Sequence, residues 1–553
     1  MNQKVLDELL AVPDHREWIV FEGLGDGQVL KEYLQNPLSQ KKKLLVLDQE
    51  IKNLGERGID EERISFFHGD NVEKFSIFLM KLAKGPIQIA QLQNGTFIRN
   101  LEVFVQHQEA YEKLEYVLRE GLKLSTSCLG HKEDGLFGLK FVLQNSNWIS
   151  KTPGVNLLKD LFKGLPAIIA STGPSLKKSI EDISKAKDKA IIICPDASLK
   201  ILLAAGIVPH FVCSLEREMA SKPFFENLSS EDLGHSQLVS FPLVPSSVIQ
   251  EFKGPHWVAY RTYRSHGFFE SQAPRGYLSA GHSVSHMCAS LADHLGCSEI
   301  LLVGQDLAFD PETLASHSEN VAYSTWSDAN SEAQLRERLK EEGDDLYWAV
   351  GNDREKIPTR GYYIVFAREF SELAKRLKAP ILNATKGGMK MDGIERADLT
   401  ARLQAWKAHG INFAAEINAI RASFQASGSI NYAELTGALK NIAGLLDQQH
   451  SMLKKMIETA GRDIIMTSLI VRQGREFWET LKLDHVAEGF GFEILGYRSA
   501  HAESEWIESF EEADSIRRLE QRAEIILSFF SDLSLCLKDA LNLIETEVPN
   551  VKT

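Results

Sequence analysis

The stretch that decides the fold reads Ala167-Ile168-Ile169-Ala170-Ser171-Thr172-Gly173-Pro174-Ser175-Leu176. Its first four residues are apolar and predict a buried β-strand. The next five predict a tight turn, and an amphipathic helix is expected from Lys177 onward. A strand that passes through a tight turn into a helix is the building unit of an α/β domain.

This turn has the composition of an anion-binding turn. Gly173 lets the backbone approach a ligand closely, and Pro174 presets φ for a first helical residue without wasting a donor. Free N–H groups at the helix start could then point at a phosphate, together with the hydroxyls of Ser171, Thr172 and Ser175. The turn lacks the Gly-Lys-Ser/Thr ending of a Walker loop. The plain alternative is a capped helix after a strand, which every α/β domain contains.

Further apolar runs follow the turn, at residues 190–194, 211–214, 237–240, 257–260, 300–303 and 381–382. Continuous apolar runs of this length are typical of a parallel sheet that is covered on both faces. We therefore predict a doubly wound parallel-sheet domain over residues 164–396.

Polar residues follow two of these strands, where ligands of doubly wound sheets bind. Asp196 and Ser198 could hold a sugar or ribose hydroxyl, or Asp196 could instead cap the next helix. Glu216 is either a ligand contact or one half of a surface ion pair with Arg217.

The flanking segments differ in pattern from the central one. Strands alternate with helices over residues 1–125, with glycines after the first strand and Asp48 after the second, so this segment is expected to be Rossmann-like. A Gly-x-Gly-x-Gly turn alone is a weak signal for a dinucleotide or methyl donor, so we interpret the segment as fold without a working site. Residues 126–163 are expected to be a helical connector, and residues 397–553 a helical C-terminal domain.

Composition limits the function classes. A chain of 553 residues is too long for one core, and its net charge of −14 argues against a general nucleic-acid binder. No apolar run approaches the length of a membrane span. The first eight residues lack a signal-peptide pattern, and no cysteines form a CxxC pair. We therefore expect the cysteines to be buried thiols and the protein to be cytoplasmic. The cysteines are Cys128, Cys194, Cys213, Cys288, Cys297 and Cys536.

Four motifs occur in order: Ile168 to Leu176, Gly206-Ile207-Val208-Pro209, Gly281-His282-Ser283-Val284-Ser285, and Leu302-Val303-Gly304-Gln305-Asp306-Leu307-Ala308-Phe309. Together they closely resemble the motility-associated factor (Maf) glycosyltransferases. The resemblance covers roughly residues 164–392, is weaker in the N-terminal part and is only architectural in the C-terminal helices.

The resemblance implies transfer of a nonulosonic acid, such as pseudaminic or legionaminic acid, from its CMP-activated form. The implied acceptors are serine or threonine hydroxyls of flagellin, in flagellum assembly and motility. The central domain is also similar to bacterial sialyltransferases, in which a Gly-Pro-Ser turn faces CMP and a later histidine is the base.

By this resemblance, the catalytic candidates are His317 and Asp306. His317 follows a strand end, and an imidazole near its unperturbed pKa could take a proton from a hydroxyl. His282 competes for this role, whereas His286 is expected to pack inside its helix.

Arg261 or Arg264 could meet the sugar carboxylate, and their expected position at a strand end is the only argument for this. The other site residues combine the turn and strand-end positions with the resemblance. The nucleotide and phosphate contacts are Ser171, Thr172, Gly173, Pro174, Ser175, Asp196, Ser198, Ser283 and Ser285, with Tyr323 as a further donor. The donor-sugar candidates are Glu216, Gln305, Asn383 and Thr385. Lys386 and the triplet Glu216-Arg217-Glu218 depart from the family pattern, which puts the identity of the donor sugar in question.

Two other functions stay open. An archaeal branch with a related central domain transfers diphosphate from ATP to a hydroxymethylpterin, and Asp196 and Asp306 are the carboxylates available for Mg²⁺. No metal site is predicted otherwise, and the flanking segments favour the Maf architecture. The third reading is a flagellin-binding chaperone that lost the chemistry. The C-terminal helices are either plain core or a docking platform for a protein acceptor.

Overall fold

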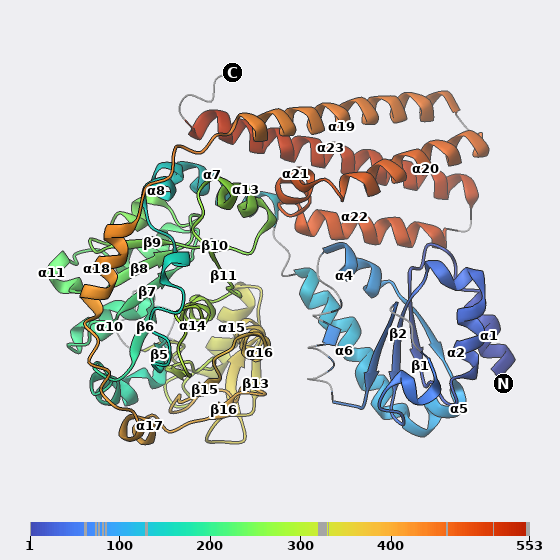
Figure 1. Cartoon of the computed structure of the whole chain (residues 1–553). Helices are drawn as coiled ribbons and strands as arrows, with labels where there is room; N and C mark the ends of the chain where they lie inside the picture. The colour runs from blue at the N-terminus through green and yellow to red at the C-terminus, as the bar shows by residue number, and fades with distance from the viewer. Residues whose placement is uncertain are drawn as a thin grey trace. The chain divides into compact units, whose positions relative to one another are not determined.

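The computed structural model describes residues 2–59, 63–71, 75, 78–79, 82, 86–127, 131–318, 329, 331–460, 463–512 and 514–548. The chain forms two compact units (Figure 1). One contains residues 1–136 and 434–542, and the other contains residues 137–433 and 543–553. These units group segments by contact in space, whereas the four segments with boundaries after residues 125, 163 and 396 follow sequence pattern and stay a prediction.

The first unit contains a four-stranded parallel sheet with the order β3-β2-β1-β4. The strands are β1 (Trp18–Glu22), β2 (Lys43–Asp48), β3 (Ile64–His68) and β4 (Thr96–Arg99). The helices α1 (Asn2–Leu10) and α2 (Gln28–Gln35) pack on one face, and α4 (Pro86–Gln93) and α6 (Gln108–Ser127) on the other. This arrangement confirms the predicted Rossmann-like fold.

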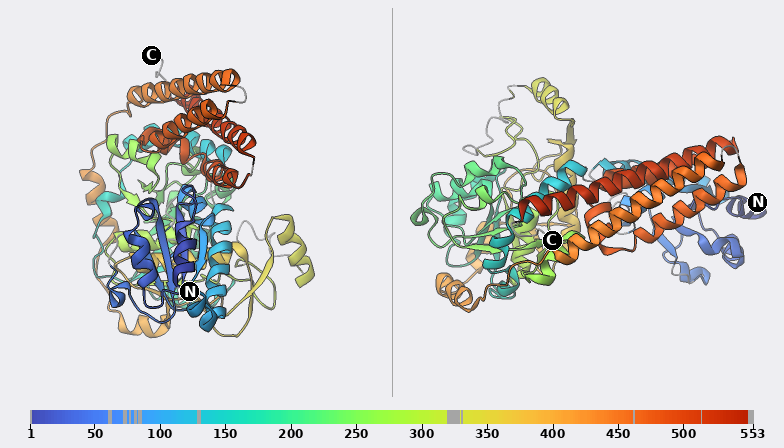
Figure 2. Two further views of the ribbon diagram at one scale, coloured as in Figure 1. Left: turned by 90° about the vertical axis from the view of Figure 1, so that its right-hand side faces the viewer. Right: turned by 90° about the horizontal axis from the view of Figure 1, so that it is seen from above.

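The first unit also contains long helices from the C-terminal part of the chain. They are α19 (Ala433–Ala460), α20 (Ile464–Leu481), α22 (Gly496–Glu508) and α23 (Ser515–Glu547). Figures 1 and 2 show α19, α20 and α23 side by side. A π-helical turn at Glu488–Phe492 interrupts the series. The helix α22 packs on α4, where Gln91 donates to Glu503 over 3.3 Å. The predicted helical C-terminal region is thus confirmed.

The second unit is built on an eight-stranded, wholly parallel sheet with the order β16-β15-β12-β5-β6-β7-β8-β9. The strands are β5 (Ala167–Ala170), β6 (Ile191–Pro195), β7 (Phe211–Ser214), β8 (Gln237–Ser240), β9 (His256–Val258), β12 (Ile300–Val303), β15 (Ile381–Asn383) and β16 (Glu395–Arg396). The sheet grows from β5 toward β9 and then returns to β12 on the other side of β5. The point between β5 and β12 is therefore the topological switch point of a doubly wound sheet.

Helices cover both faces of this sheet, as predicted. The helix α14 (Val284–His294) packs against β5, β6 and β7, and α16 (Gly361–Arg376) packs on α14. The opposite face is covered by α9 (Ile180–Ser184), α10 (Leu199–Ala204) and α17 (Leu399–Ala405). Two small additions are the pair β10 (Tyr260–Arg261) and β11 (Tyr277–Leu278), and the antiparallel pair β13 (Leu346–Ala349) and β14 (Ile357–Arg360).

One local expectation was wrong. The residues after the turn do not form an amphipathic α-helix from Lys177; they form a 3₁₀ helix at Pro174–Ser179, followed by the short α9. The N–H of Leu176 donates to the carbonyl of Gly173 over 3.0 Å, three residues back, which is the 3₁₀ pattern.

Two expectations from composition can be compared with the described residues. No helix among them is both long and apolar enough to span a membrane. Five cysteines are buried and unpaired, and Cys128 lies outside the described residues; the five are Cys194, Cys213, Cys288, Cys297 and Cys536.

Candidate active site

Ser171 joins the two strands at the switch point. It follows β5, and its hydroxyl donates to the side-chain oxygen of Gln305, which follows β12, over 2.7 Å. The hydroxyl of Ser285, in the first turn of α14, lies 2.9 Å from that of Ser171. Because a hydroxyl has only one proton, Ser285 is the donor in this second bond. The structure thus brings Ser171, Gln305 and Ser285 together at the carboxyl edge of the sheet.

The rest of the turn is held by Asp306. The N–H and the hydroxyl of Ser175 both donate to Oδ2 of Asp306, over 3.3 and 2.8 Å. Gly173 donates its N–H to the carbonyl of Gly304 over 2.7 Å. A Cβ on Gly173 would lie 2.0 Å from Oδ2 of Asp306, so a larger residue does not fit there.

The expectation of free N–H groups in this turn is therefore wrong for Gly173, Ser175 and Leu176, which all donate to acceptors of the protein itself. The acceptor at Ser175 is a carboxylate, so this part of the turn does bind an anion, but one supplied by the chain. Pro174 is buried at the start of the 3₁₀ helix. Thr172 is half-buried, and phosphate contact by the turn stays a prediction.

Asp306 is enclosed by backbone from a second loop. Its carbonyl accepts the N–H of Met389 over 2.7 Å, and a Cβ on Gly388 would lie 2.5 Å from its Cα. Burial raises the pKa of the Asp306 carboxyl to about 6, against the opposing effect of the bonds from Ser175. These contacts indicate that Asp306 positions the turn.

Asn383 and Thr385 support Gln305 from the end of β15. The hydroxyl oxygen of Thr385 accepts the N–H of Gln305 over 3.1 Å, and Oδ1 of Asn383 accepts the N–H of Thr385 over 3.0 Å. Both side chains are buried. They hold the backbone of Gln305 in place, and direct contact with a donor sugar stays a prediction.

The residues after β6 form a separate group. The carboxyl of Asp196 accepts the hydroxyl of Ser214 over 2.7 Å, and burial raises its pKa to about 7, with a further contribution from Glu216. Ser198 is fully buried, and its hydroxyl has no partner among the described residues. Asp196 and Asp306 follow the two strands that flank β5. No cluster of three His, Cys, Asp or Glu side chains suited to a metal occurs within the described ranges.

The segment that carries His317 lies against the turn, because the N–H of Ser318 donates to the carbonyl of Thr172 over 2.7 Å. Nδ1 of His317 lies 2.8 Å from the hydroxyl of Ser316. The expected ordinary pKa is wrong for this histidine: burial, aided by the positive charge of Arg360, lowers the pKa of His317 to about 4. Tyr323 falls outside the described residues.

A histidine–carboxylate pair lies at the start of α14. Ser283 caps this helix by accepting the N–H of Ser285 over 3.3 Å. Just before it, Nδ1 of His282 hydrogen-bonds to Oε1 of Glu369 in α16, and the N–H of His282 donates to Oε2 over 2.8 Å. His286 is buried inside the helix, as predicted. The sequence analysis missed Glu369, which stands in the middle of a helix with no turn or strand end to single it out.

Of the two arginines proposed for a carboxylate, Arg261 lies next to this pair. Its guanidinium donates to the carbonyl of Gly281 over 3.0 Å and stacks over the ring of Tyr263. Arg264 is the first residue of α13 (Arg264–Gln272).

The glycine turn of the first unit is filled by the chain itself. A Cβ on Gly23 would lie 2.8 Å from Cβ of Val103. Oδ2 of Asp48 accepts the N–H of Leu24 over 2.6 Å, and Oδ1 accepts two more N–H groups over 2.8 Å. These contacts support the interpretation of this segment as fold without a working site.

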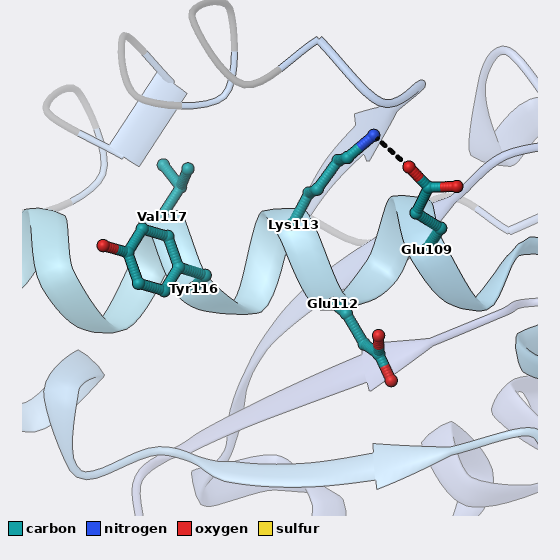
Figure 3. A pocket seen from close by; sticks show the side chains of 5 residues that line it. All are labelled: Glu109, Glu112, Lys113, Tyr116 and Val117. Atoms are coloured by element: carbon teal, nitrogen blue, oxygen red, sulfur yellow. Dashed lines mark hydrogen bonds and ion pairs between the residues drawn. The ribbon is translucent and has the colours of Figure 1, made fainter.

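A surface hollow of about 460 Å³ lies along α6 of the first unit (Figure 3). All of its lining residues come from this one helix: Glu109, Glu112, Lys113, Tyr116 and Val117. Lys113 is paired with Glu109 over 2.6 Å. An open helix face with one ion pair offers no arrangement for catalysis, so the candidate site remains the switch point.

Comparison with known proteins bears on the family model and the fold. A family model described as 6-hydroxymethylpterin diphosphokinase MptE-like matches residues 140–312, which include the turn and Asp306. No protein with a curated description matches the sequence. The chain is similar in structure to the MAf glycosyltransferase from Magnetospirillum magneticum AMB-1, with a TM-score of 0.57, 16% identity, and coverage of 99% of this chain and 84% of that one. The resemblance to the Maf glycosyltransferases noted from the motifs is thereby confirmed at the level of the fold.

Proposed function

We propose that this protein is a glycosyltransferase that moves a nonulosonic acid of the pseudaminic or legionaminic type from a CMP-activated donor to serine or threonine hydroxyls of flagellin. The observation that carries the proposal is the Ser171–Gln305–Ser285 junction at the switch point of a sheet whose fold is that of a Maf glycosyltransferase. Doubly wound sheets bind their ligands at this point.

The reaction needs its leaving phosphate stabilised. As the bond between the anomeric carbon and the phosphate oxygen breaks, CMP leaves with the electron pair and the sugar gains positive character. The amino end of α14 with the hydroxyl of Ser283, and the half-buried Thr172, could stabilise the departing phosphate. Arg261 is the candidate partner for the sugar carboxylate, because a guanidinium matches its geometry.

The acceptor hydroxyl must lose a proton as its oxygen attacks the anomeric carbon. Two histidines are candidates for this base, His317 beside Thr172 and His282 at the start of α14. Attack from the face opposite the phosphate would invert the anomeric centre.

The buried, unpaired thiols suit a reducing compartment, so we place the reaction in the cytoplasm, before flagellin is exported.

The proposal is tested by incubating the full-length protein with a panel of CMP-nonulosonic acids and unmodified flagellin, and then weighing intact flagellin. We expect a mass increase of one nonulosonic acid residue or more with at least one donor. The variant S285A removes the hydroxyl that donates to Ser171, and we expect it to slow transfer. Absence of any mass increase across the panel would overturn the proposal.

The second candidate is transfer of diphosphate from ATP to a hydroxymethylpterin, which the match of residues 140–312 to the MptE-like family model favours. In this reaction Asp306 and Asp196 would be the carboxylates available to bind Mg²⁺. ATP-dependent pterin diphosphorylation by the purified protein, together with unmodified flagellin, would replace the first proposal with this one.

A further inference from the structure

Glu369 holds the loop before α14 by three contacts. Its Oε1 accepts from Nδ1 of His282, its Oε2 accepts the N–H of His282 over 2.8 Å, and Oε2 also lies 3.7 Å from Nδ1 of His286. A Cβ on Gly281 would lie 2.3 Å from Oε2, so the glycine lets the loop approach the carboxylate. On the other side, Arg261 binds the carbonyl of Gly281. The imidazole of His282 is therefore fixed in orientation.

The carboxylate also fixes the tautomer. Burial alone would raise the pKa of Glu369, but the hydrogen bond from His282 and the two nearby imidazoles outweigh it, so the pKa lies below its usual range. An ionised carboxylate accepts the proton on Nδ1 and leaves the lone pair of Nε2 available. Nucleophile-activating bases in enzymes are commonly oriented by such a third group.

His282 can be reached by a ligand, whereas its neighbour cannot. The side chain of His282 is 48% exposed, while that of His286 is 1% exposed and its Nε2 lies 3.0 Å from the carbonyl of Phe366. Ser285, three residues after His282, hydrogen-bonds to Ser171, and three residues span at most about 11 Å. The Cα of His282 thus lies within about 11 Å of that of Ser285, at the edge of the sheet where we propose that the substrate binds.

We propose that His282, oriented by Glu369, is the group that removes the proton from the acceptor hydroxyl. This assignment rests on the proposed function. The hydroxyl proton passes to Nε2 of His282 while the oxygen bonds to the anomeric carbon and CMP departs with the electrons of the broken bond. The imidazolium is neutralised by Glu369 and later loses its proton to water.

The structure makes His317 the weaker candidate for this step. Its Nδ1 lies against the Ser316 hydroxyl, and no carboxylate of the described residues bonds to its ring. With its pKa lowered to about 4 by burial and Arg360, it is a poor proton acceptor at neutral pH, because a general base works best with a pKa near the working pH. We assign His317 to the support of the turn through the Ser318–Thr172 bond.

The assignment is tested with H282A, E369Q and the matched variant H317A in the flagellin transfer assay. We expect H282A to lower kcat by 100-fold or more while CMP still raises its melting temperature as in the wild type, and added imidazole to restore part of the activity. H317A should retain transfer within about 10-fold of the wild type. Loss of a general base typically lowers the rate by about 10²–10⁴-fold, so a smaller loss in H317A would fit a supporting role.

E369Q gives a readout that a merely structural role would not move. Loss of the ionised carboxylate removes the group that holds the proton on Nδ1 of His282, so kcat should fall while the KM for the CMP-sugar stays close to the wild-type value. If the wild type transfers the sugar and H282A keeps an activity within 3-fold of the wild type, the assignment of His282 is overturned while the proposed function stands. Absence of transfer by the wild type would instead overturn the proposed function and the assignment with it.

Discussion

Ser171 and Gln305 are 134 residues apart in the chain, yet the hydroxyl of one donates to the side-chain oxygen of the other over 2.7 Å. Their bond crosses from the end of β5 to the end of β12, the two strands between which the sheet changes its direction of growth. It connects the turn that we propose faces the nucleotide to the loop that carries Asp306.

S171A should destabilise the protein by about 2 kcal/mol, because it leaves the buried oxygen of Gln305 and the hydroxyl of Ser285 without a partner. Denaturant unfolding measures this difference. The matched control is S179A, because Ser179 is also fully buried but its hydroxyl has no partner among the described residues, so its loss should cost little. Equal destabilisation by both variants would contradict the role of the Ser171 bonds.

G173A should be strongly destabilising, by about 3 kcal/mol or more, because the new Cβ would lie 2.0 Å from the Asp306 carboxylate and 2.5 Å from the carbonyl of Gly304. G267A is the control, since Gly267 lies in α13 with nothing within 4 Å of its added Cβ. This second change should be neutral or stabilise by up to about 1 kcal/mol. Melting curves of the two variants test the contrast.

D306N should raise stability at pH 8 and lower transfer activity. Burial holds the folded-state pKa of Asp306 at about 6, above the ordinary value of 3.8, so the folded protein bears the cost of an ionised buried carboxylate above pH 6. Two pKa units correspond to roughly 3 kcal/mol, which sets the upper limit of the gain.

Because wild-type Asp306 takes up its proton as the pH falls through 6, the advantage of D306N should shrink between pH 7 and pH 5. Unfolding free energies of both proteins across this range measure the trend. A difference that does not change with pH would contradict the raised pKa.

His210 should make the protein less stable as the pH falls below 6.5. Burial, with smaller contributions from His235 and His409, lowers its folded-state pKa to about 3. The unfolded state therefore binds the proton first, and stability that is present above pH 6.5 is lost as the pH falls toward 3.

In H210N the amide oxygen can still accept the N–H of Ile192, which Nδ1 of His210 accepts over 3.0 Å, but cannot take a proton. From pH 7 to pH 5, H210N should lose roughly 2 kcal/mol less than the wild type. The control H485N makes the same substitution at an exposed histidine. An unchanged slope in H210N would refute the account.

D48A should destabilise the protein by about 2–3 kcal/mol, because the carboxylate accepts three backbone N–H groups around the glycine turn. Asp26 is an exposed neighbour that accepts the N–H of Gln28 over 3.0 Å and no further N–H from the described residues, so D26A is the milder control. We also expect NAD or S-adenosylmethionine to leave the melting temperature of the wild type unchanged. A clear rise with either ligand would show that the turn does bind one.

Part of the candidate site could be read from strand ends. The turn after β5 was predicted at the carboxyl edge of the sheet, where parallel strands bring their ends together, whereas Gln305, Asp306 and Thr385 were named from the family resemblance. What could not be read is that Asp306 uses the donors of Ser175 for itself. That bond depends on the close approach of Gly173 and Gly388, which only the folded backbone sets.

His317 and Glu369 illustrate the same limit. We expected a pKa near the unperturbed value for His317, but burial beside Arg360 lowers this pKa. Glu369 is one carboxylate among many in the helices of this chain, and its pairing with His282, 87 residues away, follows from the packing of α16 on α14.

The sequence alone determined the secondary-structure types and the layered α/β class. Apolar runs, their periodicity and the glycine turns are local properties, and they fix which faces of each element are buried. It also determined which turn would lie at the sheet edge. Only the tertiary structure decided that β5 and β12 are neighbours, that Ser171 meets Gln305, and that His282 meets Glu369. These contacts depend on strand order and helix packing over distances of many residues, where desolvation and hydrogen bonding between remote segments fix both the geometry and the pKa of each group.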